Sequence, residues 1–273
     1  MMRKRKRFLI SSRLDNNMDE LKIAVNIVRH AGRIISDGWH KKDLKIFFKG
    51  EINPVTEIDK SVENFVTEQL KTNFPDYGIL SEESDEKSGK ISARWILDPL
   101  DGTTNFTKRY PFVATSLALE KEGELVLGVV YNPILDEMFT AEKGHGAFCN
   151  GKTIWVNETA ELKSAVLGSG FPYDAWKNDD NNTVQWSRLI KQCISLRCDG
   201  SAALDLCRVA SGQLDGYWEK GLSPWDMAAG IVIVREAGGI VTDYMGGNDI
   251  FSSAEIIASN TALHREIMKA VTE

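Results

Sequence analysis

The chain has 273 residues, of which 42% are hydrophobic and 26% charged, an ordinary composition for a globular protein. This length fits one α/β domain or two fused subdomains, and the hydrophobic content excludes disorder as the main state. The formal net charge of −6 argues against a protein that binds the phosphate backbone of nucleic acids. No hydrophobic run reaches the roughly 18 residues of a membrane-spanning helix, so we expect a cytoplasmic protein with no membrane partner.

The first residues form a basic segment. Residues 3–7 all carry positive side chains, and only Phe8, Leu9 and Ile10 follow before two serines. That apolar run is shorter than the roughly 7–15 residues of a signal-peptide core. We therefore expect residues 1–17 to be a disordered, solvated arm, with contact to an acidic partner as the alternative.

Hydrophobic spacing predicts secondary structure along the rest of the chain. In the first half it predicts helices that begin at Asn17 and after Asp59, strands at 77–81 and 93–97, and a strand-rich stretch at 113–156. In the second half it predicts strands at 165–169, 216–219, 240–243 and 255–258 and helices at 184–193, 201–211, 225–237 and after Asn260. An α+β subdomain at 18–155 therefore precedes an α/β subdomain at 156–273. We expect layered helices and sheets that share one active site.

One motif needs context before it is used. Residues 146–153, GAFCNGKT, satisfy the phosphate-loop pattern G-x-x-x-x-G-K-[ST]. That pattern requires a helix at the lysine, but Lys152 is followed by Thr-Ile-Trp-Val, which is typical of a strand. Asn150-Gly151 between two such runs is a hairpin signal, so we predict a β-turn here.

The segment that indicates chemistry is residues 94–106, RWILDPLDGTTNF. An apolar strand ends at two carboxylates, Asp98 and Asp101, and Gly102-Thr103 resembles the start of a helix. Two carboxylates at about 4 Å repel by roughly 4 kcal/mol at an effective dielectric constant near 20, so a shared proton or a cation must offset their charge. Oxygen ligands without His or Cys favour Mg²⁺, Mn²⁺ or Ca²⁺ over zinc. Turn formation and helix capping are the alternative for both aspartates.

Further acids follow other predicted elements. Glu82-Glu83 ends a predicted strand, Asp226 begins an apolar helix, and Asp59 precedes the second helix. The glutamates could equally lie in a solvated loop, and the two aspartates could be helix N-terminal charges or caps.

Three segments resemble a known family. Residues 98–106, DPLDGTTNF, together with 225–230, WDMAAG, and 236–239, EAGG, are similar to the inositol monophosphatase family of metal-dependent phosphatases. Residues 82–84, 146–151 and 200–203 occur in the order of that family, and the similarity runs from about residue 19 to 271. The bacterial branch is the most similar. The resemblance implies a layered α-β-α-β-α sandwich and a homodimer that Li⁺ inhibits.

The resemblance also implies residue roles. Two or three Mg²⁺ ions would be held by Glu82, Asp98, the Leu100 carbonyl, Asp101 and Asp226. Thr103 would lie beside the attacking water, Glu82 would help to activate that water, and Asp59 would lie behind Thr103. Lys49 is a possible loop residue near the third metal. The substrate would contact Leu100, Asp101, Gly102, Thr103, Arg197, Gly200, Ser201, Ala202, Glu219 and Asp226, with the Gly102 and Thr103 amides on phosphate oxygens. For Glu219 the alternative is a solvated acid at a strand end.

The expected activity is Mg²⁺-dependent hydrolysis of a phosphate monoester by direct attack of water, because no nucleophile motif is present. The favoured substrate is myo-inositol 1-phosphate. The same carboxylates would serve fructose 1,6-bisphosphate, 3′-phosphoadenosine 5′-phosphate, NADP or histidinol phosphate. A regulatory binding protein that retains the fold is the alternative from another class.

Overall fold

The computed structural model describes residues 6–84 and 86–273, and side chains from Glu20 onward. The helices are α1 (Lys6–Trp39), α2 (Glu57–Asn73), α3 (Thr103–Lys108), α4 (Thr183–Leu189), α5 (Ala202–Ala210), α6 (Pro224–Glu236), α7 (Ile250–Ser253) and α8 (His264–Thr272). The strands are β1 (Ile46–Lys49), β2 (Asn53–Thr56), β3 (Gly78–Ser81), β4 (Ala93–Asp101), β5 (Ala114–Lys121), β6 (Glu124–Asn132), β7 (Glu137–Glu142), β8 (Ala147–Cys149), β9 (Lys152–Thr153), β10 (Val166–Ser169), β11 (Ser195–Arg197), β12 (Gly216–Lys220), β13 (Ile240–Thr242) and β14 (Glu255–Ser259). No helix among the described residues is long and apolar enough to cross a bilayer.

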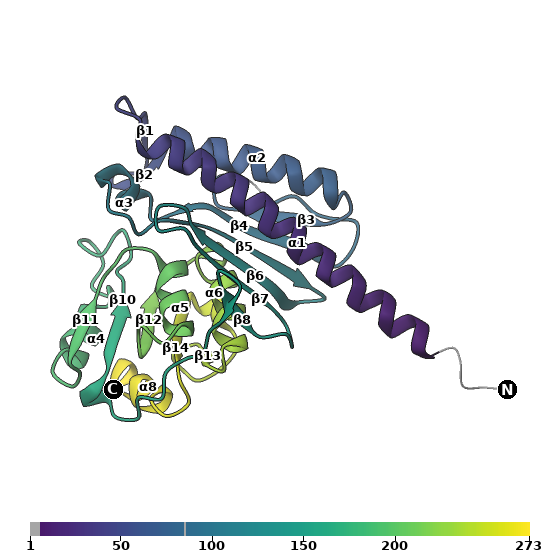
Figure 1. The fold of residues 1–273 in the computed structure, drawn as a ribbon. Helices are drawn as coiled ribbons and strands as arrows, with labels where there is room; N and C mark the ends of the chain where they lie inside the picture. Colours follow the sequence, from purple (N-terminus) through teal and green to yellow (C-terminus); the bar gives the residue numbers. More distant parts are fainter. Residues whose placement is uncertain (1–5, 85) are drawn as a thin grey trace.

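Two large sheets separate three layers of helices (Figure 1). The first sheet has seven strands in the order β3-β4-β5-β6-β7-β8-β9, and every pair except β3–β4 is antiparallel. The second has five strands in the order β11-β10-β12-β14-β13. Helices α1 and α2 cover one face of the first sheet, α5 and α6 lie between the sheets, and α4 and α8 lie on the far side of the second. The predicted α-β-α-β-α sandwich is thus confirmed.

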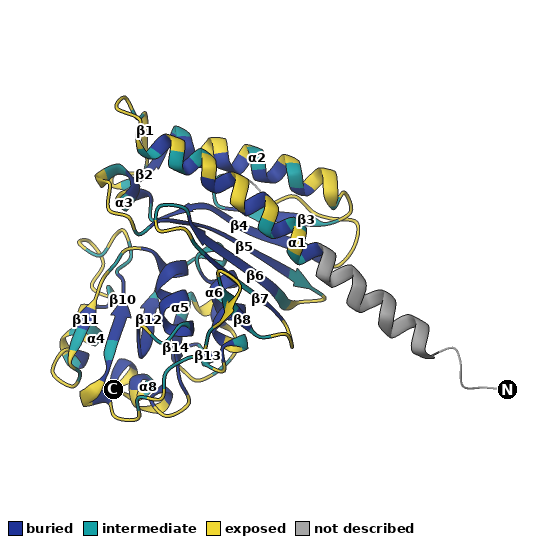
Figure 2. Cartoon of the chain, in the orientation of Figure 1, coloured by how far each residue is buried: buried dark blue, intermediate teal, exposed yellow. Residues whose placement is uncertain are grey.

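The first sheet is buried on both faces (Figure 2), and consecutive side chains of its strand β4 belong to different cores. Trp95 and Leu97 of β4 belong to the core beneath α1 and α2, whereas Ile96 belongs to the core around α5 and α6. Successive side chains of a strand point to opposite faces. A sheet covered on both faces requires apolar residues at consecutive positions, and the run Trp-Ile-Leu meets that requirement.

Small residues let α6 approach the first sheet closely. A Cβ at Gly128 of β6 would lie 2.5 Å from the Ala229 carbonyl oxygen, and a Cβ at Gly230 would lie 2.4 Å from the Leu206 side chain of α5. Atoms cannot approach so closely without displacement. The small residues of WDMAAG therefore allow α6 to pack against both the sheet and α5, with Asp226 held in its first turn.

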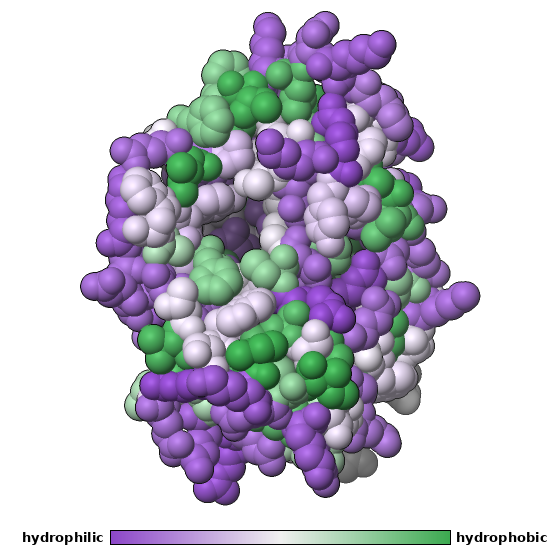
Figure 3. Space-filling model, turned by 90° about the vertical axis from the view of Figure 1, so that its left-hand side faces the viewer, coloured by the Kyte–Doolittle hydropathy of each residue, from purple (hydrophilic) through white to green (hydrophobic). Residues whose placement is uncertain are grey.

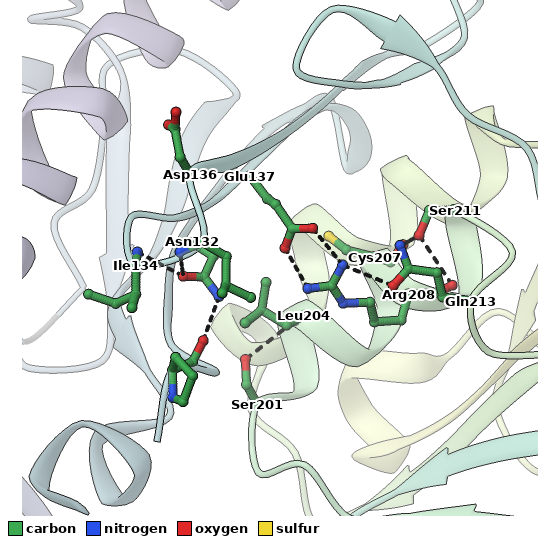
Figure 4. Close-up of polar contacts among 12 residues, drawn as sticks. Asn132, Ile134, Asp136, Glu137, Ser201, Leu204, Cys207, Arg208, Ser211 and Gln213 are labelled. Atoms are coloured by element: carbon green, nitrogen blue, oxygen red, sulfur yellow. Dashed lines mark hydrogen bonds and ion pairs between the residues drawn. The ribbon is translucent and has the colours of Figure 1, made fainter. Parts of the chain in front are cut away.

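Polar contacts fix α5 in the middle layer, as Figure 4 shows. The Ser201 hydroxyl caps the helix by accepting a hydrogen bond from the Leu204 N–H at 3.3 Å. Near its other end the Arg208 guanidinium pairs with both carboxylate oxygens of Glu137 on β7, one of them at 3.0 Å. Such a two-point contact fixes orientation as well as position, so α5 is held in place at both ends.

Most predicted elements are present, with shifts of a few residues at their ends, but the first helix begins at Lys6 and not at the predicted Asn17. The predicted strand at 93–97 continues to Asp101, and the helix predicted at 184–193 ends at Leu189. The predicted turn in residues 146–153 is confirmed: Asn150 and Gly151 have φ of 49° and 76° and connect the antiparallel strands β8 and β9. The hairpin of β1 and β2 was not predicted, because its strands have four residues each and β1 is largely exposed.

The division of the chain at residue 155 stays a prediction. The two large sheets lie on either side of it in sequence, while α5 and α6 pack between both. The backbone of residues 6–17 is part of α1, while residues 1–5 and the side chains of the whole arm lie outside the described part of the chain. The disorder of residues 1–17 stays a prediction.

Candidate active site

A cavity of about 460 Å³ takes side chains from both sheets. Figure 3 shows a hollow with a hydrophilic floor on the side of the molecule that carries α3 and β10. Twelve of the predicted site residues line the cavity: Lys49, Glu82, Asp98, Leu100, Asp101, Gly102, Thr103, Gly200, Ser201, Ala202, Glu219 and Asp226. Residues up to 177 positions apart in sequence (226 − 49) therefore meet at one place.

The end of β4 directs two aspartates into the cavity. In a regular strand, positions 98 and 101 would face opposite sides. The β4–β5 pairing instead shifts register here, because Asp98 pairs with Ser116 and Asp101 with Ala114. Three steps on β4 thus oppose two on β5, and this bulge lets both aspartates face the cavity.

Backbone and hydroxyl donors hold these aspartates. The Leu100 N–H donates to Asp98 Oδ1 at 2.9 Å, and Asp101 Oδ2 accepts from the Ser201 hydroxyl at 2.6 Å and the Ala203 N–H at 2.9 Å. The two hydrogen bonds to Asp101 link β4 to the N-terminus of α5. The predicted turn role of Asp98 and its place in the cavity are therefore both observed.

The other two carboxylates come from separate elements. Asp226 forms a capping box with Ser223, whose N–H donates to Asp226 Oδ2 at 2.7 Å. Glu82, just after β3, accepts from Lys49 Nζ at 3.1 Å, and Lys49 also bonds Glu83. In the described part of the chain the second oxygens of Asp98 and Asp226 accept no hydrogen bond from protein. Each aspartate is thus fixed by one oxygen and offers the other to the cavity.

Thr103 begins α3 and connects the cavity to Asp59. Its hydroxyl lies 2.7 Å from Asp59 Oδ1 and 2.9 Å from the Leu100 carbonyl oxygen. Asp59 itself lies outside the cavity lining and also caps α2 by accepting from the Thr56 N–H at 2.8 Å. Gly102 precedes the helix with φ of 84°, and a Cβ there would lie 2.8 Å from the Phe112 carbonyl oxygen. The close approach and the positive φ both require glycine at this position.

Burial dominates the electrostatics of the carboxylates. It is the main reason why the pKa of Glu82 rises to about 7 and that of Asp101 to about 6. Burial, and then the charge of neighbouring acids, raises the pKa of Asp98 and of Asp226 well above the ordinary value. Burial acts to lower the pKa of Lys49, but its bonds to Glu83 and Glu82 raise it overall. Buried acids that repel one another require a counter-charge before all of them can ionise.

The donor set fits a hard divalent cation. Leu100 and six carboxylates line the cavity, among them the four predicted metal ligands Glu82, Asp98, Asp101 and Asp226, and no histidine does. Such oxygen sets suit Mg²⁺, Mn²⁺ and Ca²⁺. Among the described residues, no three His, Cys, Asp or Glu side chains are placed to hold one ion together. Mg²⁺ usually binds only one or two carboxylates and completes its shell with water and substrate phosphate, so the spacing is compatible with that ion.

Glu219 lines the cavity from β12, on the other large sheet. Its carboxyl accepts a hydrogen bond from the Tyr217 hydroxyl and is 9% exposed. A Cβ at Gly170 would lie 2.3 Å from both Glu219 oxygens, so glycine leaves the room that this carboxyl occupies. The alternative of a solvated acid at a strand end is wrong for this residue.

Arg197 is the predicted substrate residue that the structure places elsewhere. Its exposed side chain donates to the Leu196 carbonyl at 3.1 Å and to Ser195, and it does not line the cavity. Its contact with substrate stays a prediction.

Sequence reasoning missed other residues that shape the cavity. Asn105 donates to the carbonyl oxygens of Phe112 and Asp199, each at 2.8 Å, and so ties α3 to the turn before α5. Tyr173 and Asp205 also line the cavity. Asn105 lies within the segment 98–106, which could have drawn attention to it. Asp205 follows Ser201 by four residues, a spacing that places the two on one side of a helix.

Comparisons with known proteins agree with this geometry. A model of the inositol monophosphatase family matches residues 17–273. An inositol-1-monophosphatase of Mesorhizobium japonicum is 41% identical over 92% of this chain and 95% of its own length. The Nus factor SuhB of Pasteurella multocida shows the same identity and the same coverage. A crystal structure of the suppressor protein suhB from Bartonella henselae is 39% identical, covers 93% of this chain and 99% of its own, and superposes with a TM-score of 0.88. The chain therefore belongs to the inositol monophosphatase family and is a phosphoric monoester hydrolase.

Proposed function

We propose that this protein hydrolyses the phosphate monoester of a polyol, first of all myo-inositol 1-phosphate, and that it requires Mg²⁺ to do so. The observation that carries the proposal is the joint placement of four carboxylates, Thr103 and Glu219 around one cavity. The name of the Mesorhizobium relative supports the choice of substrate. Two or three Mg²⁺ ions are proposed.

Glu82, Asp98, the Leu100 carbonyl, Asp101 and Asp226 would hold the metal. Bound Mg²⁺ would supply charge neutralisation for the phosphate and would lower the pKa of a coordinated water. The side chains around the metal would orient the substrate and the attacking water. Because each aspartate is fixed by a backbone or hydroxyl donor, the negative charges are already oriented before substrate enters.

Thr103 and Glu82 would prepare the attacking water. Asp59 accepts the hydroxyl hydrogen of Thr103, so the lone pairs of Thr103 Oγ1 remain available to accept from a water in the cavity. Glu82, with a pKa of about 7, can take a proton from that water near neutral pH. The Gly102 and Thr103 amides would bind phosphate oxygens. Direct in-line attack by water then needs no covalent intermediate with the enzyme.

Phosphate release tests this proposal. The wild-type protein should release inorganic phosphate from myo-inositol 1-phosphate in Mg²⁺, and chelation with EDTA should abolish release. The panel also contains fructose 1,6-bisphosphate, 3′-phosphoadenosine 5′-phosphate, NADP and histidinol phosphate. A higher kcat/KM on one of these would change the substrate but keep the reaction. No release from any of them would overturn the proposed function.

A regulatory role is a second candidate, favoured by the name Nus factor SuhB of relatives from Pasteurella multocida and Vibrio cholerae. A protein with this role would act through binding and would not need hydrolysis. Complementation of a deletion strain by the Asp98→Asn variant would support it, whereas failure of that variant would tie the cellular role to catalysis. The homodimer, Li⁺ inhibition and cytoplasmic location remain proposals that rest on family resemblance.

A further inference from the structure

Asp205 is a buried acid that no role has yet explained. It lies in the first turn of α5, is 2% exposed and lines the same cavity as Glu219. Its Oδ1 is buried without a hydrogen-bond partner, and no donor to its carboxyl is found in the described part of the chain. Buried carboxyl groups are normally paired, because an unsatisfied one is costly.

Asp205 cannot turn away from the cavity at low cost. The Ser201 cap and the Arg208–Glu137 pair fix α5 at its two ends (Figure 4). The side chain also lies against the backbone of β10, since a Cβ at Gly168 would be 3.6 Å from Asp205 Oδ1. Oδ1 is covered by protein, and Oδ2 accepts no hydrogen bond from the described residues. Because Asp205 lines the cavity, Oδ2 is the oxygen left for a partner from outside the chain.

Asp205 and Glu219 lie side by side along the end of β10. The Cβ position of Gly168 faces Asp205, and that of Gly170 faces Glu219. Gly168 lies in β10 and Gly170 directly follows the end of that strand, so the two carboxyls contact one short segment of the chain. Two carboxyls on one segment can accept hydrogen bonds from different hydroxyls of one ring or chain of carbon atoms.

The charge at this end of the cavity limits what can bind there. Lys49 is the only cationic side chain among the described residues that line the cavity, and it is paired with Glu82 and Glu83. A second phosphate beside Asp205 and Glu219 would therefore meet two acids and no cation. Hydroxyl groups, by contrast, would supply the donors that these acids lack.

We propose that Asp205 is a specificity-determining residue, which accepts hydroxyl groups of a neutral polyol monophosphate and disfavours substrates that carry a second phosphate. This inference rests on the proposed function and narrows its substrate class. A site built to bind a hydroxyl discriminates strongly against molecules that lack it, because its own polar groups are then left unpaired.

The test compares three substrates with purified full-length protein: myo-inositol 1-phosphate, fructose 1,6-bisphosphate and p-nitrophenyl phosphate, whose leaving group lacks further hydroxyls. In Asp205→Ala, KM for inositol 1-phosphate should rise about tenfold with little change in kcat. Asp205→Asn keeps an oxygen that can accept from a hydroxyl, so its KM should rise less. The kcat/KM on p-nitrophenyl phosphate should stay within about twofold, and the ratio of bisphosphate to inositol phosphate turnover should rise about tenfold. A merely structural role would not change these ratios.

Asp199→Asn is the matched control. It removes the same charge near Asp205, on which the Asp199 charge acts, but Asp199 does not line the cavity. Its substrate ratios should therefore change much less than those of the Asp205 variants. Thermal unfolding of each variant reports folding separately. If wild type releases phosphate and both Asp205 variants keep its substrate ratios, the role of Asp205 is refuted while the proposed function stands. If wild type releases phosphate from no substrate, the proposed function fails, and this inference fails with it.

Discussion

The two ends of the cavity both carry buried acids, but they are built differently. At one end Asp98 and Asp226 each have one oxygen fixed by a backbone N–H and one available, and Lys49 lies nearby. At the other end Glu219 is bonded to Tyr217, and Asp205 has no bond to its carboxyl among the described residues. The first arrangement suits ions that need fixed oxygen ligands; the second suits neutral groups that donate hydrogen bonds.

This difference predicts how each end contributes to turnover. Acids that hold metal should determine the rate of the chemical step, because the charge they neutralise develops in the transition state. Acids that bind the alcohol part should determine affinity and choice of substrate. Buried carboxyl groups in one cavity can therefore control the rate of the chemical step at one end and the affinity for substrate at the other.

The largest effect is expected at the metal end. Asp98→Asn should lower kcat by about a thousandfold or more and weaken Mg²⁺ binding, because a charged ligand becomes a neutral one. Asparagine can still accept the Leu100 N–H, so the fold should be retained. Phosphate release and calorimetric titration with Mg²⁺ measure the two effects.

Asp136→Asn is a suitable control for that variant. Asp136 is exposed in the turn between β6 and β7 at φ of 52°, a conformation that asparagine tolerates, and it does not line the cavity. A kcat for Asp98→Asn above one tenth of the wild-type value would contradict the assigned role.

The next effect concerns pH at the other end of the cavity. Burial is the main cause that raises the pKa of Glu219 from 4.5 to about 7, against the opposing effect of the Tyr217 hydroxyl. A carboxyl with a higher pKa in the folded state contributes stability that is present below the unfolded-state value and is lost as pH rises through the folded-state value. From pH 4.5 to about 7, this group should lower the free energy of unfolding by about 3 kcal/mol at most.

Urea unfolding at pH 5 and pH 8, with chelator present, measures that loss. Glu219→Gln cannot ionise, so its stability should fall less over this interval than that of wild type. The difference between the two proteins isolates Glu219 from the other buried acids. An identical fall in both would show that Glu219 does not titrate in this range.

More of the acids proposed to hold metal than of the acids proposed to bind the alcohol part of the substrate could be identified from the sequence, for a physical reason. Asp98 and Asp101 lie three residues apart on one segment, and the bulge that turns them to the same side is local to that segment. Asp226 and Glu82 were assigned only through family resemblance, since a capping acid and a loop acid have other common uses. Asp205 had no local pattern, because its significance depends on β10 and β12, which are distant in sequence.

Secondary-structure elements, like site residues, were predicted best where the signal lies within one continuous segment. The apolar run of β4 and the helix at α6 were predicted, but the burial of β4 on both faces and the close packing of α6 became visible only in the structure. The β1–β2 hairpin has strands of only four residues each, and β1 has no buried residue, so its pairing left little hydrophobic pattern to detect. Neither the position of Lys49 beside Glu82 nor that of Arg197 outside the cavity could be derived from spacing along the chain.

A smaller loss of rate is expected at Thr103. Thr103→Val removes the hydroxyl that bonds Asp59 and would accept from the attacking water, so kcat should fall about a hundredfold with little change in KM. Thr103→Ser keeps the hydroxyl and should recover most of the rate. Initial rates on inositol 1-phosphate test both variants. Equal losses in valine and serine variants would indicate that the methyl group, and so packing, is what matters.

The smallest effect is expected for Glu219→Ala, which removes the acid proposed to bind the alcohol part of the substrate and leaves the predicted metal ligands in place. KM for inositol 1-phosphate should rise about tenfold, and kcat should change by less than about threefold, because the lost hydrogen bond is present in both ground and transition states. The measurement is a full substrate curve at saturating Mg²⁺. An unchanged KM would show that Glu219 does not bind the alcohol. A loss confined to kcat would instead place Glu219 with the metal end, and the two ends of the cavity would no longer be functionally distinct.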